Sequence, residues 1–234
     1  MQPDRSQSEI ITVQDLLGDF ATDGWGPARA EEAFDLMADR YRALVSAYEA
    51  VAGIVDGAVD EGTPLPTACR GVLLFAHRRL FEGMMTNAGL FRQRDDPGGS
   101  GVHFGGVRGD RREWRFKGAP ASDIDAEMDA AFAFLADQRH VPGGLDRARD
   151  DAARFYTELS RIHPFYDANG RTGRFVVSVY LHLHGWFVEW GRLNEKEFIK
   201  RINNVNEKQT AQTDYEAFLL GFWSRHVVRT DDLG

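Results

Sequence analysis

Cysteine is almost absent from this chain, because Cys69 is the only one among its 234 residues. One cysteine cannot form an intrachain disulfide or supply the cysteine pairs of a structural zinc site. Long apolar runs are missing too, since no stretch approaches the roughly 18 consecutive apolar residues of a membrane span. The segment MQPDRSQSEIITVQDLLGDF has no basic start followed by an apolar stretch, so it does not resemble a secretory signal peptide. We therefore expect a cytoplasmic protein without a membrane partner.

Basic residues are outnumbered by acidic ones, and the formal net charge is −8. Nonspecific binding to nucleic acid requires a basic face, so this charge argues against a nucleic-acid partner. It leaves room for a small basic pocket. The hydrophobic fraction of 43% is sufficient for a packed core, and the length allows one large domain or two small ones.

Strand patterns are scarce, and most of the chain has helical periodicity. After a polar lead-in over residues 1–29, the pattern predicts helices over residues 31–55, 64–89, 122–140, 145–162, 172–187, 194–208 and 213–228. The single β signal lies near residues 101–117, where VHFGGV and EWRF flank RGDR and predict a hairpin. The sequence therefore predicts one all-α domain with one hairpin.

The stretch HPFYDANGRTGR, residues 163–174, is unusually rich in chemically active side chains. It lies between two predicted helices, and Pro164 disfavours a helical backbone at His163. The second helix is expected to begin near residues 169–171, and the N-terminus of a helix binds anions readily. Arg171 and Arg174 are three residues apart, so both lie on one helical face and both suit phosphate oxygens.

The same stretch contains a possible base and a possible metal ligand. His163 can accept a proton near neutral pH, and Asp167 is a hard oxygen ligand of the kind that Mg²⁺ uses together with substrate phosphates. A structural alternative is a polar loop in which the Asp–Arg pairs and the histidine only stabilise the helix ends. The density of these residues at one helix start favours phosphoryl or nucleotidyl transfer.

This stretch resembles the signature of the Fic family, HxFx(D/E)GNGRxxR, at every position except Ala168, where the family usually has glycine. AGLFR at residues 88–92 is similar to the segment that leads into the family's flap, and the predicted hairpin is similar to the flap itself. The resemblance covers residues 64–225 within an expected domain of residues 30–230. It implies an all-α Fic fold.

The resemblance also implies an activity, because Fic proteins mostly transfer AMP from ATP to a Ser, Thr or Tyr hydroxyl of a target protein. By this resemblance His163 is the catalytic base, Asp167 holds Mg²⁺, and Phe165 is an apolar anchor of the loop. ATP is the expected co-substrate. The nucleotide-binding or phosphate-binding residues are expected to be Ala168, Asn169, Gly170, Arg171, Thr172, Gly173 and Arg174, with Asn169 also contributing its side chain.

The flap is expected to hold the target protein by strand addition, with Val102, His103 and Phe104 as its contact residues. The family's inhibitory motif, (S/T)xxxE(G/N), is not found around any glutamate of the chain. Inhibition is therefore expected to be absent or supplied by a separate protein such as an antitoxin.

Two positions bear on the nucleotide. Many family members have asparagine where this chain has Ser178, which weakens the preference for adenine, whereas Gly170 favours AMP transfer over the kinase branch, which tends to have lysine there. UMP, phosphocholine or phosphate transfer remains open, as does a catalytically weak Fic scaffold that binds a nucleotide or a partner. His182 and His184 are interpreted as structural, because two residues apart they point to different helix faces.

Overall fold

The computed structural model describes residues 13–95, 103–104, 107–108, 111–112, 116–190 and 225–233. Its α-helices are α1 (Val13–Phe20), α2 (Ala30–Ser46), α3 (Tyr48–Asp60), α4 (Leu65–Phe81), α5 (Ile124–Phe132), α6 (Gly144–Ile162) and α7 (Asn169–Leu183). Short 3-10 helices lie at Pro27–Arg29, Ala121–Asp123 and Thr230–Leu233. The predicted all-α fold with a β-hairpin is confirmed, whereas the predicted domain boundaries stay predictions.

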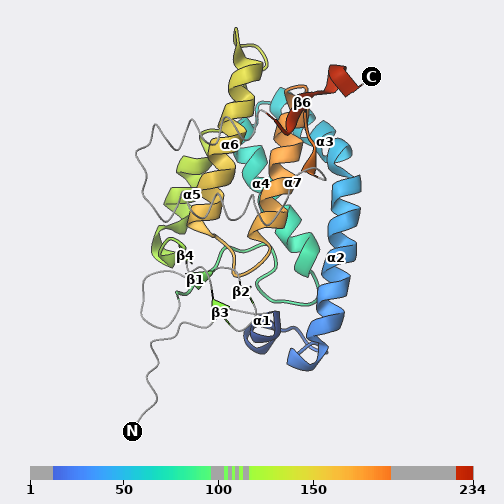
Figure 1. Cartoon of the computed structure of the whole chain (residues 1–234), viewed down its shortest axis with the longest axis vertical. Coiled ribbons are helices and arrows are strands. Elements are labelled where there is room, and N and C mark those ends of the chain that lie inside the picture. Colours follow the sequence, from blue (N-terminus) through green and yellow to red (C-terminus); the bar gives the residue numbers. More distant parts are fainter. Residues whose placement is uncertain are drawn as a thin grey trace.

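The helices surround a central pair formed by α4 and α7. Figure 1 shows this pair in the middle of the molecule, with α5 and α6 on one side and α2 and α3 on the other. Helix α7 packs against α3, α4 and α6, and it is buried around most of its circumference. Apolar residues on most sides of a helix are typical of a helix in the protein interior.

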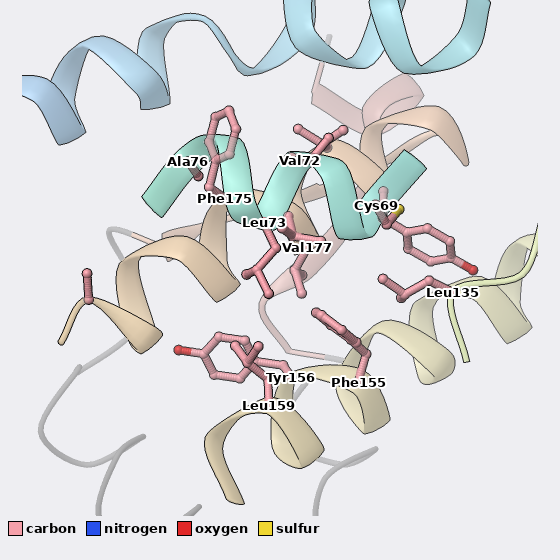
Figure 2. Close-up of a cluster of buried hydrophobic side chains, with 14 of the residues drawn as sticks. Cys69, Val72, Leu73, Ala76, Leu135, Phe155, Tyr156, Leu159, Phe175 and Val177 are labelled. Carbon is pink, nitrogen blue, oxygen red and sulfur yellow. The ribbon is translucent and has the colours of Figure 1, made fainter. Parts of the chain in front are cut away.

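The core between α4, α6 and α7 consists of tightly packed aliphatic and aromatic side chains. Leu73 of α4 and Val177 of α7 face Phe155 and Leu159 of α6 (Figure 2), and none of the four has any exposed surface. Large-to-small changes in such a core cost about 2–5 kcal/mol each. This core fixes the crossing of α6 and α7, and the HPFYDANGRTGR loop joins these two helices.

Helices α6 and α7 approach each other closely at Gly173. A Cβ placed on Gly173 would lie 2.3 Å from Cδ2 of Leu159 and 3.0 Å from Cε2 of Tyr156. Because no side chain fits between the two helices there, glycine sets their separation. This separation also sets the distance between the C-terminus of α6 and the N-terminus of α7.

The hairpin lies where the sequence predicted it. Strand β1 (His103–Phe104) pairs with β4 (Phe116–Lys117), and β2 (Val107–Arg108) pairs with β3 (Arg111–Arg112), both antiparallel. Figure 1 shows these strands at the same end of the bundle as the junction between α6 and α7. The expected flap is therefore close to the HPFYDANGRTGR loop between α6 and α7.

A second strand pair was missed by the sequence analysis. Strand β5 (Trp186–Val188) pairs antiparallel with β6 (Val227–Arg229). The sequence predicted helix for residues 186–187 and 227–228, which is wrong. Gly185, with a φ of 73°, ends α7 before this pair, and the partner strands are separated by about forty residues of chain. The predicted helix at 194–208 and most of that at 213–228 lie outside the described residues.

Several helix boundaries also differ from the predicted ones. The predicted helix at 31–55 is divided at Ala47 into α2 and α3, so that α2 packs mainly on α4 and α3 on α7. Helix α4 ends at Phe81, because Gly83 adopts a φ of 73°. The helix that begins after Pro120 ends at Phe132, and Ser122 does not cap it.

The lead-in over residues 1–29 is not only a polar extension. It contains α1, in which Leu17 is buried. Ala21, the first residue after α1, forms a β-bridge with Met85. The backbone N–H of Thr22 donates to Met84 O at 3.0 Å. Few apolar residues are therefore enough to attach this segment to the domain. Among the described residues, no helix is long and apolar enough to cross a membrane.

Replacing Gly173 with alanine should lower the free energy of unfolding by about 1–3 kcal/mol, because the added methyl group overpacks the contact between α6 and α7. The matched control is Gly53→Ala in α3, where no atom lies within 4 Å of the added Cβ. That change should raise the stability by up to about 1 kcal/mol. Urea unfolding measures both, and shifts in the same direction would contradict the close approach described here.

Candidate functional site

The loop between α6 and α7 begins and ends in left-handed backbone conformations. His163, the residue after α6, has a φ of 54°, and Ala168, the residue before α7, has a φ of 62°. Within the described part of the chain no other non-glycine residue has a positive φ. Such conformations cost about 1–3 kcal/mol each and cluster at functional sites. Both strained residues belong to the stretch that the sequence singled out.

The side chain of Asn169 closes this loop from the inside. Its Oδ1 accepts the backbone N–H of Phe165 at 2.9 Å, and its Nδ2 donates to Phe165 O at 2.9 Å. Asn169 is buried. Its amide group is thus committed to the loop in this structure, and only its backbone N–H remains for the predicted contact with an anion.

Phe165 attaches the loop to α4 and to the segment that follows α4. Its ring stacks on that of His77, with 4.0 Å between centroids and 10° between planes, and lies 5.3 Å from the Phe91 ring. Phe165 is buried, as an apolar anchor requires. The backbone N–H of Gly89 donates to Nδ1 of His77 at 2.9 Å. His77 is therefore a buried support of the loop.

The imidazole of His163 is neutral in the free protein. His163 is half-buried at the C-terminal end of α6. Desolvation, together with the positive charge of Arg92, lowers the pKa of His163 to about 3. At neutral pH this residue therefore has an unprotonated nitrogen and can accept a proton, which is the role the sequence predicted for it.

Asp167 and Arg171 contact each other. Arg171 Nη2 lies 3.3 Å from Asp167 Oδ2, and Asp167 Oδ1 accepts the backbone N–H of Ala168. Both side chains retain some exposure, 31% for Asp167 and 20% for Arg171. An exposed pair of this kind contributes at most about 1 kcal/mol, so a ligand can separate the two charges at little cost.

Arg174 lies toward α2 and not toward Asp167. Its Nε donates to the hydroxyl of Tyr41 at 3.3 Å, and its guanidinium lies 5.8 Å from the centroid of that ring. The surrounding hollow is lined by Tyr41, Val45, Tyr48, Arg174, Phe175, Ser178 and Trp190. Ser178 Oγ accepts a hydrogen bond from Nε1 of Trp190 at 2.8 Å. No sequence pattern connects Tyr41 with the motif, because it precedes the motif by more than 120 residues.

The remaining predicted residues, Gly170, Thr172 and Gly173, lie in or next to the first turn of α7. Gly170 is exposed, whereas the other two are buried. A Cβ on Gly170 would lie 3.9 Å from both Arg174 Nη1 and the Tyr156 hydroxyl. Thr172 is buried, and its N–H and hydroxyl both donate to Ala168 O at 2.9 Å. Gly173 contacts α6. Thr172 and Gly173 thus stabilise the helix start, and their predicted contact with a nucleotide stays a prediction.

The predicted target-binding residues of the hairpin are only partly described. His103 pairs with Lys117 and Phe104 with Phe116 in strands β1 and β4. Val102 lies outside the described residues, as do the side chains of the strand residues. The roles of these residues as contacts to a target protein stay predictions.

The described residues contain no group of three or more His, Cys, Asp or Glu side chains that could hold a metal ion. His184 is buried, with Nδ1 2.8 Å from Tyr180 O and Nε2 accepting the N–H of Gln138 at 3.1 Å. Its two ring nitrogens are thus used within the protein, which confirms the structural interpretation. A metal ion at the loop would have Asp167 as its carboxylate and would need further oxygen ligands from a substrate.

This arrangement of a base, a carboxylate, a helix N-terminus and two arginines agrees with a comparison of sequences. The profile of the Fic/DOC family matches residues 69–181. Residues 69–181 belong to the Fic/DOC family. The matched segment runs from α4 to α7 and includes the hairpin and the loop. No curated protein sequence matches the chain significantly.

Solved structures of Fic domains share the fold. The N-terminal Fic domain of a VirB-translocated Bep effector from Bartonella quintana is 16% identical, covering 82% of this chain and 88% of that one, with a TM-score of 0.53. BepC from Bartonella tribocorum is 15% identical over 80% of this chain and 88% of that one, with a TM-score of 0.50. A Bep Fic domain from Bartonella sp. AR 15-3 is 13% identical over 80% and 83%, with a TM-score of 0.51.

Replacing Ala168 with glycine should raise the free energy of unfolding by about 0.5–1 kcal/mol. Glycine removes the left-handed strain of about 1–2 kcal/mol, and part of that gain is offset by the larger entropy of the unfolded chain. The control is Ala43→Gly at an exposed position of α2, which should lose about 1 kcal/mol. Thermal and urea unfolding give both values. A loss of equal size at the two positions would argue against strain at Ala168.

The buried His77 should make the fold weaken as the pH falls. Burial, with a contribution from Arg171, lowers the pKa of His77 to about 3, whereas the unfolded histidine has a pKa of about 6.5. Below pH 6.5 the unfolded state binds a proton that the folded state does not bind. The free energy of unfolding should therefore fall between pH 7.5 and pH 5 by about 1–2 kcal/mol from His77 alone.

His77→Gln tests this, because the difference between the two pH values should become smaller by that amount, even if the variant is less stable overall. His140→Gln, at an exposed position, is the control and should leave the difference unchanged. Equal pH dependence in wild type and His77→Gln would contradict the buried neutral histidine.

Proposed function

We propose that this Fic domain transfers AMP from ATP to a Ser, Thr or Tyr hydroxyl of a target protein, with Mg²⁺ as cofactor. The observation that carries the proposal is the loop of residues 163–168. This loop begins at His163, whose imidazole is neutral, contains the carboxylate of Asp167 and leads directly into the first turn of α7. Each of these groups has a distinct task in nucleotidyl transfer.

The first turn of α7 supplies the site for the phosphates. The first N–H groups of a helix have no intrahelical acceptor, and the helix dipole adds positive partial charge. Ala168, in its left-handed conformation, directs the chain into this turn. Gly170 has no side chain to keep a phosphate away. Arg171 lies on the same turn. When a ligand binds, its guanidinium leaves Asp167 and pairs with phosphate oxygens.

Asp167 suits a magnesium ion. Mg²⁺ bound with a nucleotide usually has one or two protein carboxylates and takes its other ligands from phosphates and water. Asp167 provides one carboxylate, held at the helix start by the N–H of Ala168 and still partly exposed. When bound, the ion neutralises the charge of the phosphates.

His163 takes the proton of the target hydroxyl. The hydroxyl oxygen forms a bond to the α-phosphorus, the bond from that phosphorus to the bridging oxygen breaks, and pyrophosphate leaves. The proton of the hydroxyl passes to the unprotonated nitrogen of the imidazole. A base with a pKa of about 3 is weak in the free protein, but the negative charge of a bound nucleotide stabilises the imidazolium and raises the pKa of His163.

Related structures support a nucleotide as the donor. The BepC structure contains AMPPNP, and the Bartonella quintana domain contains ADP. For this chain we infer a hydroxyl-bearing target protein that the hairpin holds beside His163, with His103 and Phe104 as contacts. Because the sequence has no inhibitory motif of the family, we further infer that any inhibitor is a separate protein.

The test of this function is label transfer. The purified chain, Mg²⁺ and ATP labelled at the α-phosphate, or separately at the γ-phosphate, are incubated with a cell lysate. Protein bands should appear with the α-label only and should disappear with EDTA. His163→Ala should reduce the labelling at least about 10²-fold, because a general base contributes that much or more.

His140→Ala, at an exposed position outside the loop, is the control and should label as wild type does. Bands from the γ-label alone would indicate a kinase and contradict AMP transfer. An absence of label in every lane, together with measurable ATP binding by calorimetry, would indicate a binding scaffold. If the chain neither transfers label nor binds ATP, the result would indicate a UMP or phosphocholine donor, which the same assay can test.

A further inference from the structure

The most completely buried charged side chain in the described part of the protein is Arg92, outside the sequence motif. Its side chain has no exposed surface. Burying a guanidinium costs several kcal/mol unless its donors are satisfied. Its Nε donates to His163 O at 2.9 Å, Nη1 to Asp95 Oδ1 at 3.0 Å, and Nη2 to Ala119 O and, at 3.4 Å, to Ile162 O.

These acceptors belong to three segments that meet beside the loop. Ile162 and His163 form the C-terminal end of α6, where unpaired carbonyl groups and the helix dipole favour a cation. Asp95 belongs to the stem that leads into the hairpin, which we define as residues 91–95. Ala119 belongs to the stem that leads out of it, residues 118–121. One guanidinium therefore joins both stems of the hairpin to the end of α6.

Backbone contacts strengthen this junction. The N–H of Arg92 donates to Pro164 O at 2.9 Å, and the N–H of Ala119 donates to Ile162 O at 3.0 Å. Asp95 Oδ1 also accepts the N–H of Ala121 at 2.8 Å, so this carboxylate connects the two stems. Each stem thus donates one backbone hydrogen bond to residues 162–164. In addition, the side chain of Arg92 in the first stem donates to Ala119 O in the second.

The second stem also touches the histidine itself. A Cβ placed on Gly118 would lie 2.9 Å from Ile162 O and 3.0 Å from Cβ of His163. Since the backbone of His163 is left-handed, its carbonyl is oriented differently from the carbonyls of the helical residues before it. The Nε donor of Arg92 holds that carbonyl, and a strained residue persists only where its surroundings determine it.

We propose that Arg92 is a positioning residue that fixes the hairpin and His163 as one unit, so that a peptide bound by the hairpin meets the imidazole at a set distance. This role rests on the proposed function. Arg92 touches neither substrate nor reacting atoms in it. The nucleotide is held by α7, on the other side of the loop, so a loss at Arg92 should affect the chemical step and leave nucleotide binding intact.

Arg92→Lys tests the proposal, because lysine keeps the positive charge and loses the planar set of donors. The matched control is Arg139→Lys. Arg139 is a mostly buried arginine with hydrogen bonds to Asp137 and Asp56, and it lies on the α5–α6 connection away from the loop. Circular dichroism verifies that both variants are folded. In Arg92→Lys, kcat for labelling a target should fall at least tenfold, with the Kd for ATP within twofold of wild type.

Arg139→Lys should change neither constant, although it should lower the melting temperature. Unchanged kcat in folded Arg92→Lys would overturn the proposal. So would a Kd for ATP that rises in proportion to the loss of kcat, because that result indicates a general disturbance of the fold.

Two readouts on the free protein separate this proposal from the proposed function. Hydrogen exchange at the amides of Arg92 and Ala119 should accelerate at least tenfold in Arg92→Lys and remain unchanged in Arg139→Lys. In Arg92→Gln, NMR titration should show an upward shift of the pKa of His163, because the charge that lowers it is gone. If wild type transfers no label, these two results still decide whether Arg92 couples the stems to His163.

If Arg92→Lys does not fold, Asp95→Ala replaces it. This change leaves the guanidinium in place and removes the bridge between the two stems. Exchange at the Ala121 amide should then accelerate while exchange within α6 stays slow. Slow exchange at Ala121 in this variant would overturn the proposed connection.

Discussion

The structure of this domain depends on how the chain turns from α6 into α7. The turn needs left-handed backbone at His163 and at Ala168, and neither residue is glycine. Two hydrogen bonds between Asn169 and Phe165 stabilise the turn internally, and three outside supports hold it in place. His77 of α4 stacks on Phe165, Arg92 holds the carbonyl of His163, and α6 contacts α7 at Gly173. The strain is tolerated because packed groups surround it on several sides.

The charges near this turn follow a simple division. The buried guanidinium of Arg92 is fully engaged with protein acceptors and serves the structure. Arg171 is more exposed, and its contact with Asp167 at 3.3 Å is weak. Arg174 lies against Tyr41 beside a hollow. Although the net charge of the chain is −8, several arginines lie near the start of α7. Those that could bind an anion, Arg171 and Arg174, have only weak contacts within the protein.

The sequence predicted local features well and distant contacts poorly. Helices α6 and α7, the turn between them and the hairpin follow from periodicity, proline and glycine within a short window. Beside Arg78 and Arg79, His77 has the sequence context of a solvated helix face. Yet it lies four residues from both Leu73 and Phe81, on the buried face of α4, and this spacing was a usable signal. Nothing local could reveal that Tyr41 meets Arg174 or that β5 pairs with β6. The AGLFR segment was noticed, but burial of Arg92 only becomes evident when the stems and α6 are placed together.

The spacing between α6 and α7 explains why the site can be formed from so short a stretch. Gly173 brings the two helices together one turn after the start of α7, and the aliphatic core below it keeps their crossing fixed. His163 ends one helix and Ala168 precedes the other, so the imidazole and the N-terminal N–H groups of α7 are separated by the loop alone. A change in this crossing would move His163 relative to the first turn of α7 even if every residue of the loop were retained. The close contact between two helices therefore determines the geometry of the site, and the polar loop supplies its chemistry.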